Sequence, residues 1–420
     1  MKPYIPVGSI PPHIKIPSDI IVYLDYHSKV ADGGGDLILD FRKSDDFLHF
    51  VSHFESIKKE DTIGTYIIIK GYNGNKRLMR GCYYQLNIQL LKQAKYSPIT
   101  DSYLFIAEFD FSDYDFKNNP EAELLQSHEP LDPSEMFRGR SYKSVAVNNN
   151  LINSDLKLYI ADVGQANWNE LRHNGITIVQ YDMGAELHAT KQQVDAIYTA
   201  HAPKVDPNKK AILVISHWDM DHIHCLCSMS VQDMHDTFSK VWCPDTIKSN
   251  TAANILARLQ KALTSANVKC VLPHHHTPRT DYHMHPLQQL NNNVHLYIGE
   301  NRRNRNHSGI VMFVEGSSIS VNYTGDCLLS QADEVLQDVL QNGTNVSQHV
   351  LIAPHHGGAN QKSNMHYTIQ PPITYTQVCI SVGNGNTYGH PDAKMLKYLQ
   401  SVANGGVKRT DKQGDIHLNL

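Results

Sequence analysis

The chain has 420 residues, of which 41% are hydrophobic and 19% are charged, so it is long enough for two domains and unlike a disordered protein. Its 38 basic and 42 acidic residues give a net charge of −4, which excludes a globally basic nucleic-acid-binding protein. No apolar run approaches the roughly 20 residues that span a bilayer, and the seven scattered cysteines fit no disulfide framework. We therefore expect a cytoplasmic protein without a membrane partner.

The first third of the chain predicts a mixed α/β domain of unknown role. Strand-like runs lie at 19–25, 65–70 and 102–109, with helix-like stretches between them. Residues 116–153 are rich in Asn, Pro, Ser and charge, which is typical of a linker. We expect one domain over residues 1–150, linker included, and a second over 154–420.

In the second domain, strands and helices alternate, which indicates layered sheets covered by helices. Hydrophobic periodicity predicts strands over 156–160, 176–181, 211–215, 310–314, 318–323, 350–353 and 378–382. Apolar stripes predict helices over 251–263, 332–340 and 395–402. The strands at 310–314 and 318–323 are expected to form a hairpin, and Pro391 is expected in the first turn of the last helix.

A cluster of potential metal ligands follows the buried strand at 211–215. His217, Asp219, Asp221 and His222 lie within six residues. The alternating pair His217 and Asp219 can face one ion, and the adjacent pair Asp221 and His222 can face a second. Imidazole and carboxylate suit zinc, manganese or iron. The alternative is a polar loop that carries these residues by chance.

Three further strands end in histidine or aspartate. The segments are Tyr323-Thr324-Gly325-Asp326, Ala353-Pro354-His355-His356-Gly357 and Tyr388-Gly389-His390-Pro391. Each by itself favours a structural role. Together with the first cluster they favour a metal centre at one edge of a sheet.

These segments resemble the metallo-β-lactamase superfamily, whose signature His-x-[His/Asp]-x-Asp-His is met by residues 217–222. More narrowly, they resemble the hydrolase domain of bacterial competence DNA-uptake channel proteins and its free-standing relatives. That subgroup also carries the equivalents of Asp162-Val163-Gly164-Gln165 and Asp182-Met183-Gly184. The resemblance covers about residues 154–420. The chain departs from the subgroup at Ala166-Asn167-Trp168 and at Ile223-His224-Cys225.

The resemblance implies an αββα sandwich that holds two divalent ions, with zinc expected and manganese or magnesium as alternatives. Asp326 would bridge the two ions, while the sequence leaves open which of His355, His356 and His390 complete the ligand shell. The ligands that the resemblance implies are His217, Asp219, Asp221, His222, Asp326, His355 and His356. The residues expected to support them are Asp162, Asp182 and His307.

Two adjacent ions can lower the pKa of a shared water, so we predict a hydrolase that uses a metal-bridged hydroxide. The catalytic residues are expected to be Asp221, His356 and His390, with a histidine that binds no ion protonating the leaving group. A basic loop before the strand at 310–314 favours a phosphodiester, although a solvated charged loop is an equal alternative. The expected substrate-binding residues are Arg302, Arg303, Arg305, Asn386 and Tyr388.

We therefore predict a nuclease or nucleotide phosphodiesterase that acts on nucleic acid or nucleotides. One alternative is an ester, thioester or lactam hydrolase of the same fold. Another is a metal-bearing interaction protein with decayed catalysis, whose first domain binds a protein partner.

Overall fold

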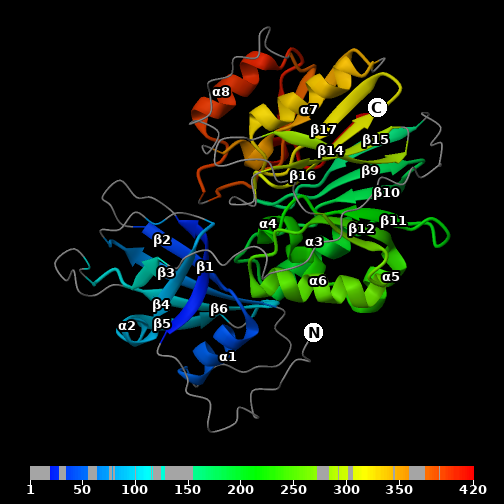
Figure 1. Ribbon diagram of the computed structural model, residues 1–420. Helices are drawn as coiled ribbons and strands as arrows, with labels where there is room; N and C mark the ends of the chain where they lie inside the picture. The colour runs from blue at the N-terminus through cyan, green and yellow to red at the C-terminus, as the bar shows by residue number, and fades with distance from the viewer. Residues whose placement is uncertain are drawn as a thin grey trace. The chain divides into compact units, whose positions relative to one another are not determined.

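The computed structural model describes residues 19–27, 35–54, 64–74, 78, 81–99, 101–114, 116, 124–127, 155–271, 283–291, 293–300, 306–343, 346–358, 374–386 and 388–420. The chain divides into two compact units, and Figure 1 labels helices and strands of both. The first unit contains residues 1–138 and the later segment Ile247–Leu256, and the second contains the rest. The sequence did not predict that a late segment joins the first unit. The predicted boundary near residue 150 lies outside the described residues and stays a prediction.

The first unit is a seven-stranded sheet with the strand order β5-β6-β3-β2-β1-β4-β7. Its strands are β1 (Asp19–His27), β2 (Gly35–Phe41), β3 (Gly64–Tyr72), β4 (Tyr83–Asn87), β5 (Lys95–Ile99), β6 (Leu104–Asp110) and β7 (Leu125–Ser127). Helices α1 (Ser44–Ser52) and α2 (Ile88–Leu91) accompany the sheet. Phe41, Phe50 and Phe109 pack together in its core. The unit is mixed α/β, as predicted.

The late segment is held in the first unit by hydrogen bonds. The Tyr83 hydroxyl donates to the main-chain oxygen of Lys248 at 2.9 Å, and Ser44 Oγ donates to Asn250 Oδ1 at 2.8 Å. A Cβ atom at Gly64 would lie 2.2 Å from Thr251 Oγ1, so only glycine permits this approach.

Asp40 is a buried acid of the first unit and makes its stability depend on pH. Burial raises the pKa of Asp40 to about 7, although Ser249 and Thr251 lie against the carboxyl group. The folded state therefore retains a proton that the unfolded state loses above pH 4, and stability falls as pH rises from about 4 to about 7. We expect this group to lower the free energy of unfolding by about 4 kcal/mol across that range.

An Asp40→Asn variant should lose this pH-dependent part of the free energy of unfolding. Urea unfolding followed by far-ultraviolet circular dichroism at pH 5 and pH 8 measures it. Asp45→Asn, at an exposed position of α1, is the control and should keep the native pH dependence. An Asp40→Asn variant that destabilises between pH 5 and pH 8 as much as the native chain would contradict the expectation.

The second unit contains two seven-stranded sheets. The first sheet has the order β13-β12-β11-β10-β9-β8-β21, and the second has the order β14-β15-β16-β17-β18-β19-β20. The strands of the first are β8 (Leu156–Ile160), β9 (Asn169–His173), β10 (Ile176–Tyr181), β11 (Ala211–Val214), β12 (Phe238–Pro244), β13 (Val268–Val271) and β21 (Ile416–Asn419). Those of the second are β14 (Met284–Asn291), β15 (Val294–Gly299), β16 (Ile310–Glu315), β17 (Ile319–Tyr323), β18 (Gln348–Ile352), β19 (Gln377–Ile380) and β20 (Val407–Arg409).

Alternating side chains of these strands build two separate cores. On β16, Ile310, Met312 and Val314 join residues of both sheets in the core between them. The intervening Val311 and Phe313 pack on the outer side, against α7 (Leu329–Gln341) and α8 (Ala393–Val402). This period of two is what a strand buried on both faces requires.

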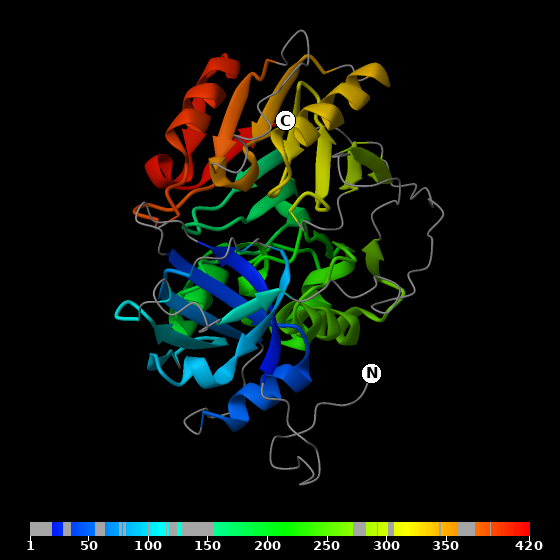
Figure 2. The ribbon, with the colours of Figure 1, turned by 60° about the vertical axis from the view of Figure 1, so that its left-hand side comes forward.

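The helices cover the outer sides of the two sheets. Figures 1 and 2 show α7 and α8 beside the second sheet, whereas α3 (Lys191–His201) and α5 (Val231–Thr237) lie on the side of the first. The remaining helices are α4 (Met220–Ile223), α6 (Asn250–Leu263) and α9 (Thr410–Gln413). The layer order is helix, sheet, sheet, helix, so the predicted αββα sandwich is confirmed. Within the described part of the chain, no helix is long and apolar enough to cross a membrane.

The strand pairing brings the predicted polar segments to one edge. Strands β17, β18 and β19 run parallel to one another, and β10 runs parallel to β11, so each group ends at a shared edge. The predicted hairpin of β16 and β17 is also present as an antiparallel pair. One detail differs: Asp392 caps α8 by accepting from the main-chain nitrogens of Lys394 and Met395, so Pro391 precedes the helix.

Candidate metal centre

The loop after β11 buries two of its four candidate ligands completely. His217 and His222 have no exposed surface, and their ring centroids are 4.0 Å apart. Asp219 lies just before α4, where its main-chain oxygen accepts from His222 at 3.0 Å. The Asp221 side chain is 30% exposed and is the most accessible of the four. The short helix α4 thus turns His217 and His222 toward one another.

Asp326 lies beside His217 and His222, with one carboxylate oxygen facing each histidine. Its Oδ2 is 3.7 Å from His217 Nε2, and its Oδ1 is 3.1 Å from His222 Nε2. The residue follows β17 through Gly325, which has a φ of +53°. A Cβ atom at Gly325 would lie 2.6 Å from the Cβ of Ser216. Glycine therefore lets this turn pack against the loop that follows β11, residues 215–222, which we call the ligand loop.

The second group is formed by Asp221, His222 and His356. His356 Nε2 is 3.2 Å from Asp221 Oδ2, and His222 Nε2 is 3.9 Å from Asp221 Oδ1. The other ring nitrogen of His356, Nδ1, bonds to the main-chain oxygen of Ser381 at 2.8 Å. Because that bond requires a proton on Nδ1, the lone pair of a neutral His356 lies on Nε2, toward Asp221.

The adjacent histidines His355 and His356 have different surroundings. His355 Nδ1 contacts Asp326 Oδ2, whereas His356 contacts Asp221. Both residues have a φ of +53°, a left-handed conformation that is uncommon for histidine and that directs the two rings apart. The structure therefore shows which carboxylate each of the two histidines contacts, which the sequence alone did not show.

His390 lies beside both of these histidines without joining either ligand group. Its ring centroid is 5.3 Å from that of His355 and 6.3 Å from that of His356. Its Nδ1 is buried and has no hydrogen-bond partner within the described residues. Burial, followed by the charges of His355 and His356, lowers the pKa of His390 to about 3 in the metal-free chain.

Asp182, at the end of β10, orients the ligand loop. Its Oδ2 accepts from His222 Nδ1 at 2.8 Å and from Ser216 Oγ at 2.7 Å, and its Oδ1 accepts from the Ser216 main-chain nitrogen at 2.7 Å. The bond to Nδ1 leaves His222 Nε2 facing Asp326. A carboxylate behind a ligating histidine in this way fixes the ring and raises its basicity.

We expect Asp182→Asn to weaken zinc binding about 10- to 100-fold, because the amide cannot hold His222 as the carboxylate does. Competition with a chromogenic chelator measures the affinity, and thermal unfolding checks that the variant is folded. Asp236→Asn, at an exposed residue of α5, is the control and should bind zinc like the native chain. Equal affinities for native and Asp182→Asn chains would refute this role.

The segment Ala166-Asn167-Trp168, read in the sequence as a departure, supports the ligand loop. The main-chain nitrogen of Asn167 donates to the main-chain oxygen of Asp221 at 2.8 Å, and its Nδ2 lies 3.3 Å from His222 Nδ1. Gly184 donates to the Asn167 oxygen, and a Cβ atom there would lie 1.7 Å from the Asp221 oxygen. Sequence reasoning missed this role because the bonds are mostly made by main-chain atoms.

Several predicted residues lie away from the ligands. Asp162 is exposed, and its main chain bonds to Asp415, so it does not support the centre. The main-chain oxygen of His307 accepts from Gln331 Nε2, whereas its neighbour Asn306 donates to Asp326 Oδ2 at 3.1 Å. Asn386 bonds to the main chain of Gly383 and His390 and holds its own loop instead of facing a substrate.

The other predicted substrate-binding residues divide into two sets. Tyr388 stacks on His390 with ring centroids 6.2 Å apart, which leaves it beside the centre. Arg302, Arg303 and Arg305 lie outside the described residues.

The donor atoms fit divalent cations. Two groups, His217 with His222 and Asp326, and Asp221 with His222 and His356, each place their ligand atoms within 4.8 Å of one another. His217 Nε2 is buried without a hydrogen-bond partner among the described residues. An imidazole nitrogen with no protein partner, surrounded by carboxylates, is the donor arrangement that zinc uses.

Electrostatics of the metal-free chain point the same way. Burial alone would raise the pKa of Asp221 and Asp326, but the neighbouring histidines outweigh it and hold both well below the usual range. Burial would lower the pKa of His222 and His356, but the carboxylates outweigh it and raise both. These carboxylates thus depend on nearby positive charge, which a divalent ion supplies in place of protons.

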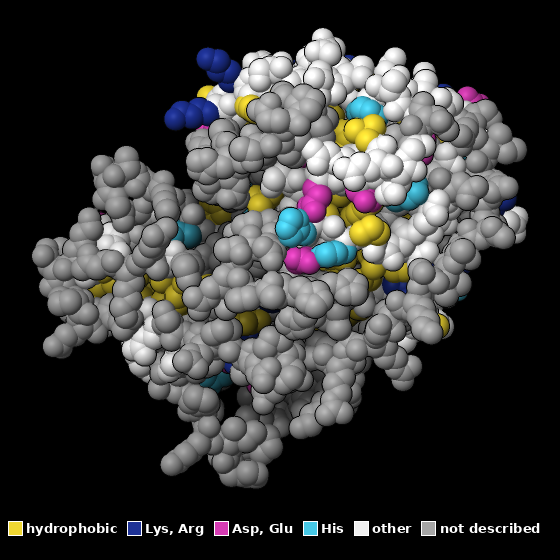
Figure 3. Space-filling view, turned by 45° about the horizontal axis from the view of Figure 1, so that its top comes forward, with side chains coloured by type: hydrophobic (Ala, Val, Ile, Leu, Met, Phe, Trp, Pro, Cys, Tyr) yellow, Lys and Arg dark blue, Asp and Glu magenta, His cyan; other side chains and the backbone are white. Residues whose placement is uncertain are grey.

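Some other histidine and acidic side chains form pairs at the surface. Figure 3 shows histidine and acidic side chains next to one another on one face of the molecule. Exposed pairs include His283 with Glu334 at 2.9 Å and His235 with Asp236 at 2.8 Å. Among the residues that the structure covers, only the two buried groups bring three ligand atoms together.

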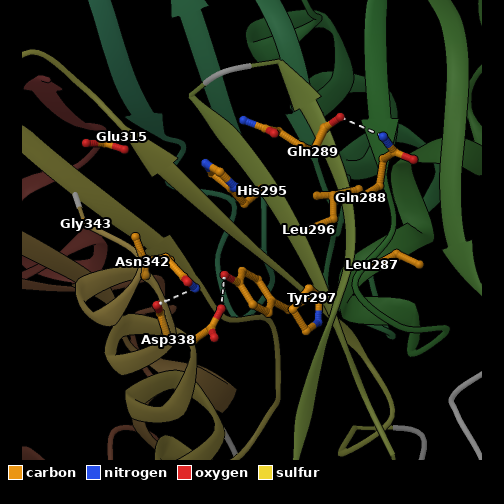
Figure 4. A pocket seen from close by; sticks show the side chains of 12 residues that line it. Leu287, Gln288, Gln289, His295, Leu296, Tyr297, Glu315, Asp338, Asn342 and Gly343 are labelled. Atoms are coloured by element: carbon orange, nitrogen blue, oxygen red, sulfur yellow. Dashed lines mark hydrogen bonds between the residues drawn. The ribbon is translucent and has the colours of Figure 1, made fainter. Parts of the chain in front are cut away.

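A cleft of about 530 Å³ lies elsewhere in the second unit, between β14, β15 and α7 (Figure 4). Its lining includes Tyr297, whose hydroxyl donates to Asp338 at 2.8 Å, and Asn342, which donates to the main-chain oxygen of Asp338. None of its lining residues is a candidate ligand. The cleft and the candidate centre are therefore separate features.

No protein-family model matches the chain, and no curated protein matches it significantly. Similar solved structures include Tm1679, described as a metal-dependent hydrolase of the β-lactamase superfamily, at 11% identity and a TM-score of 0.36, covering 63% of this chain and 99% of that one. CmlA, a diiron β-hydroxylase from Streptomyces venezuelae, is 15% identical with a TM-score of 0.33, covering 63% of this chain and 54% of CmlA. The short form of human tRNase Z is 11% identical with a TM-score of 0.30, covering 60% and 90%.

Proposed function

We propose that the second unit is a metal-dependent hydrolase with two divalent ions, zinc being expected. The observation that carries the proposal is the position of Asp326, whose Oδ2 faces His217 and whose Oδ1 faces His222. His217, Asp219 and Asp326 would hold one ion, and Asp221, His222 and His356, with Asp326, would hold the other. Such ions supply an activated water at neutral pH and stabilise negative charge that develops on the substrate.

Within this proposal the histidines have different tasks. His356 is engaged through both ring nitrogens, by Ser381 and toward Asp221, so it serves as a ligand and not as a proton donor. His355 holds Asp326. His390 is the histidine beside the centre whose Nδ1 has no partner in the described part of the chain. Its lowered pKa leaves the ring neutral at neutral pH, so we propose that it accepts the proton released by the attacking water and passes that proton to the leaving group.

We propose a phosphodiester as the substrate. Arg302, Arg303 and Arg305 immediately precede Asn306, which contacts Asp326, and guanidinium groups pair well with phosphate. The narrower resemblance to the competence-channel hydrolases supports the same substrate class. Because Asp221 is the most exposed ligand of its loop, we expect the substrate to approach from its side.

The test combines metal content per chain with a substrate panel. The purified protein is incubated with zinc or manganese and bis-nitrophenyl phosphate, single- and double-stranded DNA, RNA and cyclic nucleotides. A thioester and a chromogenic lactam represent the alternative hydrolases. Two bound ions with cleavage of a phosphodiester support the proposal. If ions bind and only the thioester or the lactam is cleaved, the phosphodiester proposal is wrong and the substrate belongs to that other class. If ions bind and nothing is cleaved, the result favours an interaction protein.

A further inference from the structure

We infer that Asn306 is a positioning residue that holds Asp326 in its bridging orientation, an inference that rests on the proposed function. Asn306 is 5% exposed and donates from Nδ2 to Asp326 Oδ2 at 3.1 Å. It occupies the turn before β16, and that turn is anchored to the ligand loop because the Ile310 nitrogen donates to the Ser216 oxygen at 2.8 Å.

The orientation of this carboxylate matters because Oδ2 faces His217 and Oδ1 faces His222. Rotation about its Cβ–Cγ bond would move Oδ1 away from His222 and Oδ2 away from His217 together. Asn306 and His355 both contact Oδ2 and oppose that rotation. A neutral amide is suited to this task, because it fixes the carboxylate without cancelling the charge that attracts the cations.

His307 offers a matched comparison one residue along. Its main-chain oxygen accepts from Gln331 Nε2 at 2.9 Å, and a Cβ atom at Gly299 would lie 1.9 Å from that oxygen. These contacts fix the main chain of the turn and do not require the imidazole. His307→Ala is therefore a control for a side-chain replacement in the same turn, while replacing Asn306 tests the bond to Asp326.

The experiment compares Asn306→Ala, Asn306→Asp and His307→Ala with the native chain, loaded with manganese alone. Equilibrium dialysis gives the ions bound per chain, and electron paramagnetic resonance reports magnetic coupling between two Mn²⁺ ions that share a bridging ligand. Asn306→Ala should bind manganese about 10- to 100-fold more weakly and lose the coupled signal. Asn306→Asp keeps the shape but cannot donate, so it should show the same loss. His307→Ala should match the native chain.

Circular dichroism confirms folding, and if Asn306→Ala fails to fold, the nearly isosteric Asn306→Asp decides. Native-like affinity and coupling in Asn306→Asp would overturn the role of the donor. Equal losses in His307→Ala and Asn306→Ala would also overturn it, since the turn and not the amide would then be responsible. A native chain that binds no pair of ions would instead reject the proposed function itself, so the two failures are distinguishable.

Discussion

Replacing Asp326 with asparagine is expected to remove paired metal binding and to lower hydrolysis by more than about 100-fold. The carboxylate directs one oxygen toward His217 and the other toward His222, and an amide offers one weaker neutral oxygen. Three histidines, His355, His222 and His217, outweigh the effect of burial on the pKa of Asp326 and keep it charged. Asparagine removes that charge from the middle of the centre.

Inductively coupled plasma mass spectrometry of the dialysed protein and turnover of bis-nitrophenyl phosphate measure the two effects. Asp338→Asn is the matched control, because Asp338 is an acid of α7 that accepts from Tyr297 and belongs to neither ligand group. It should keep both ions and full activity. An Asp326→Asn chain that retains two ions would contradict the bridging position from which the whole proposal starts.

A His390→Gln variant is expected to retain both ions while kcat falls about 10²- to 10⁴-fold. Glutamine approximates the size of histidine but cannot transfer a proton. The loss should be smallest for substrates whose leaving group needs no protonation, such as nitrophenolate, and largest for an alkoxide leaving group. Steady-state kinetics with two such phosphodiesters, together with metal analysis, separate a loss of proton transfer from a loss of bound metal.

His235→Gln, at an exposed residue of α5, is the control for a histidine remote from the ligands. If His390→Gln loses an ion along with activity, His390 is a ligand and the proton donor must be sought elsewhere. If both leaving groups lose the same factor with the ions retained, His390 does not act on the leaving group.

Much of the fold was predictable because its signals are local. The alternation in β8, the apolar run of β11 and the stripes of α6 and α7 depend on neighbouring residues in the sequence, and each element formed close to the predicted bounds. The αββα layering follows from these elements, since strands buried on both faces must be covered by helices. The positions of His217 and Asp326 at strand ends were predictable for the same reason, because the strands before them have local sequence signals.

The contacts between segments were not predictable in this way. Asn306 and His307 are adjacent in a turn, where neither the strand nor the helix period applies, so sequence favoured the better ligand type and missed the residue that faces Asp326. The inclusion of Ile247–Leu256 in the first unit likewise depends on contacts between residues about 200 positions apart in the sequence.

By itself the sequence determined the residue types at the strand ends, and with them the expectation of a cation-binding centre, because ligand chemistry belongs to single side chains. Only the tertiary structure decided which neighbours meet. His356 joins Asp221 while His355 meets Asp326, because two consecutive left-handed residues send adjacent rings in different directions. The main-chain nitrogen of Asp162 donates to the distant Asp415 carboxylate, and Asn386 bonds to the main chain of its own loop.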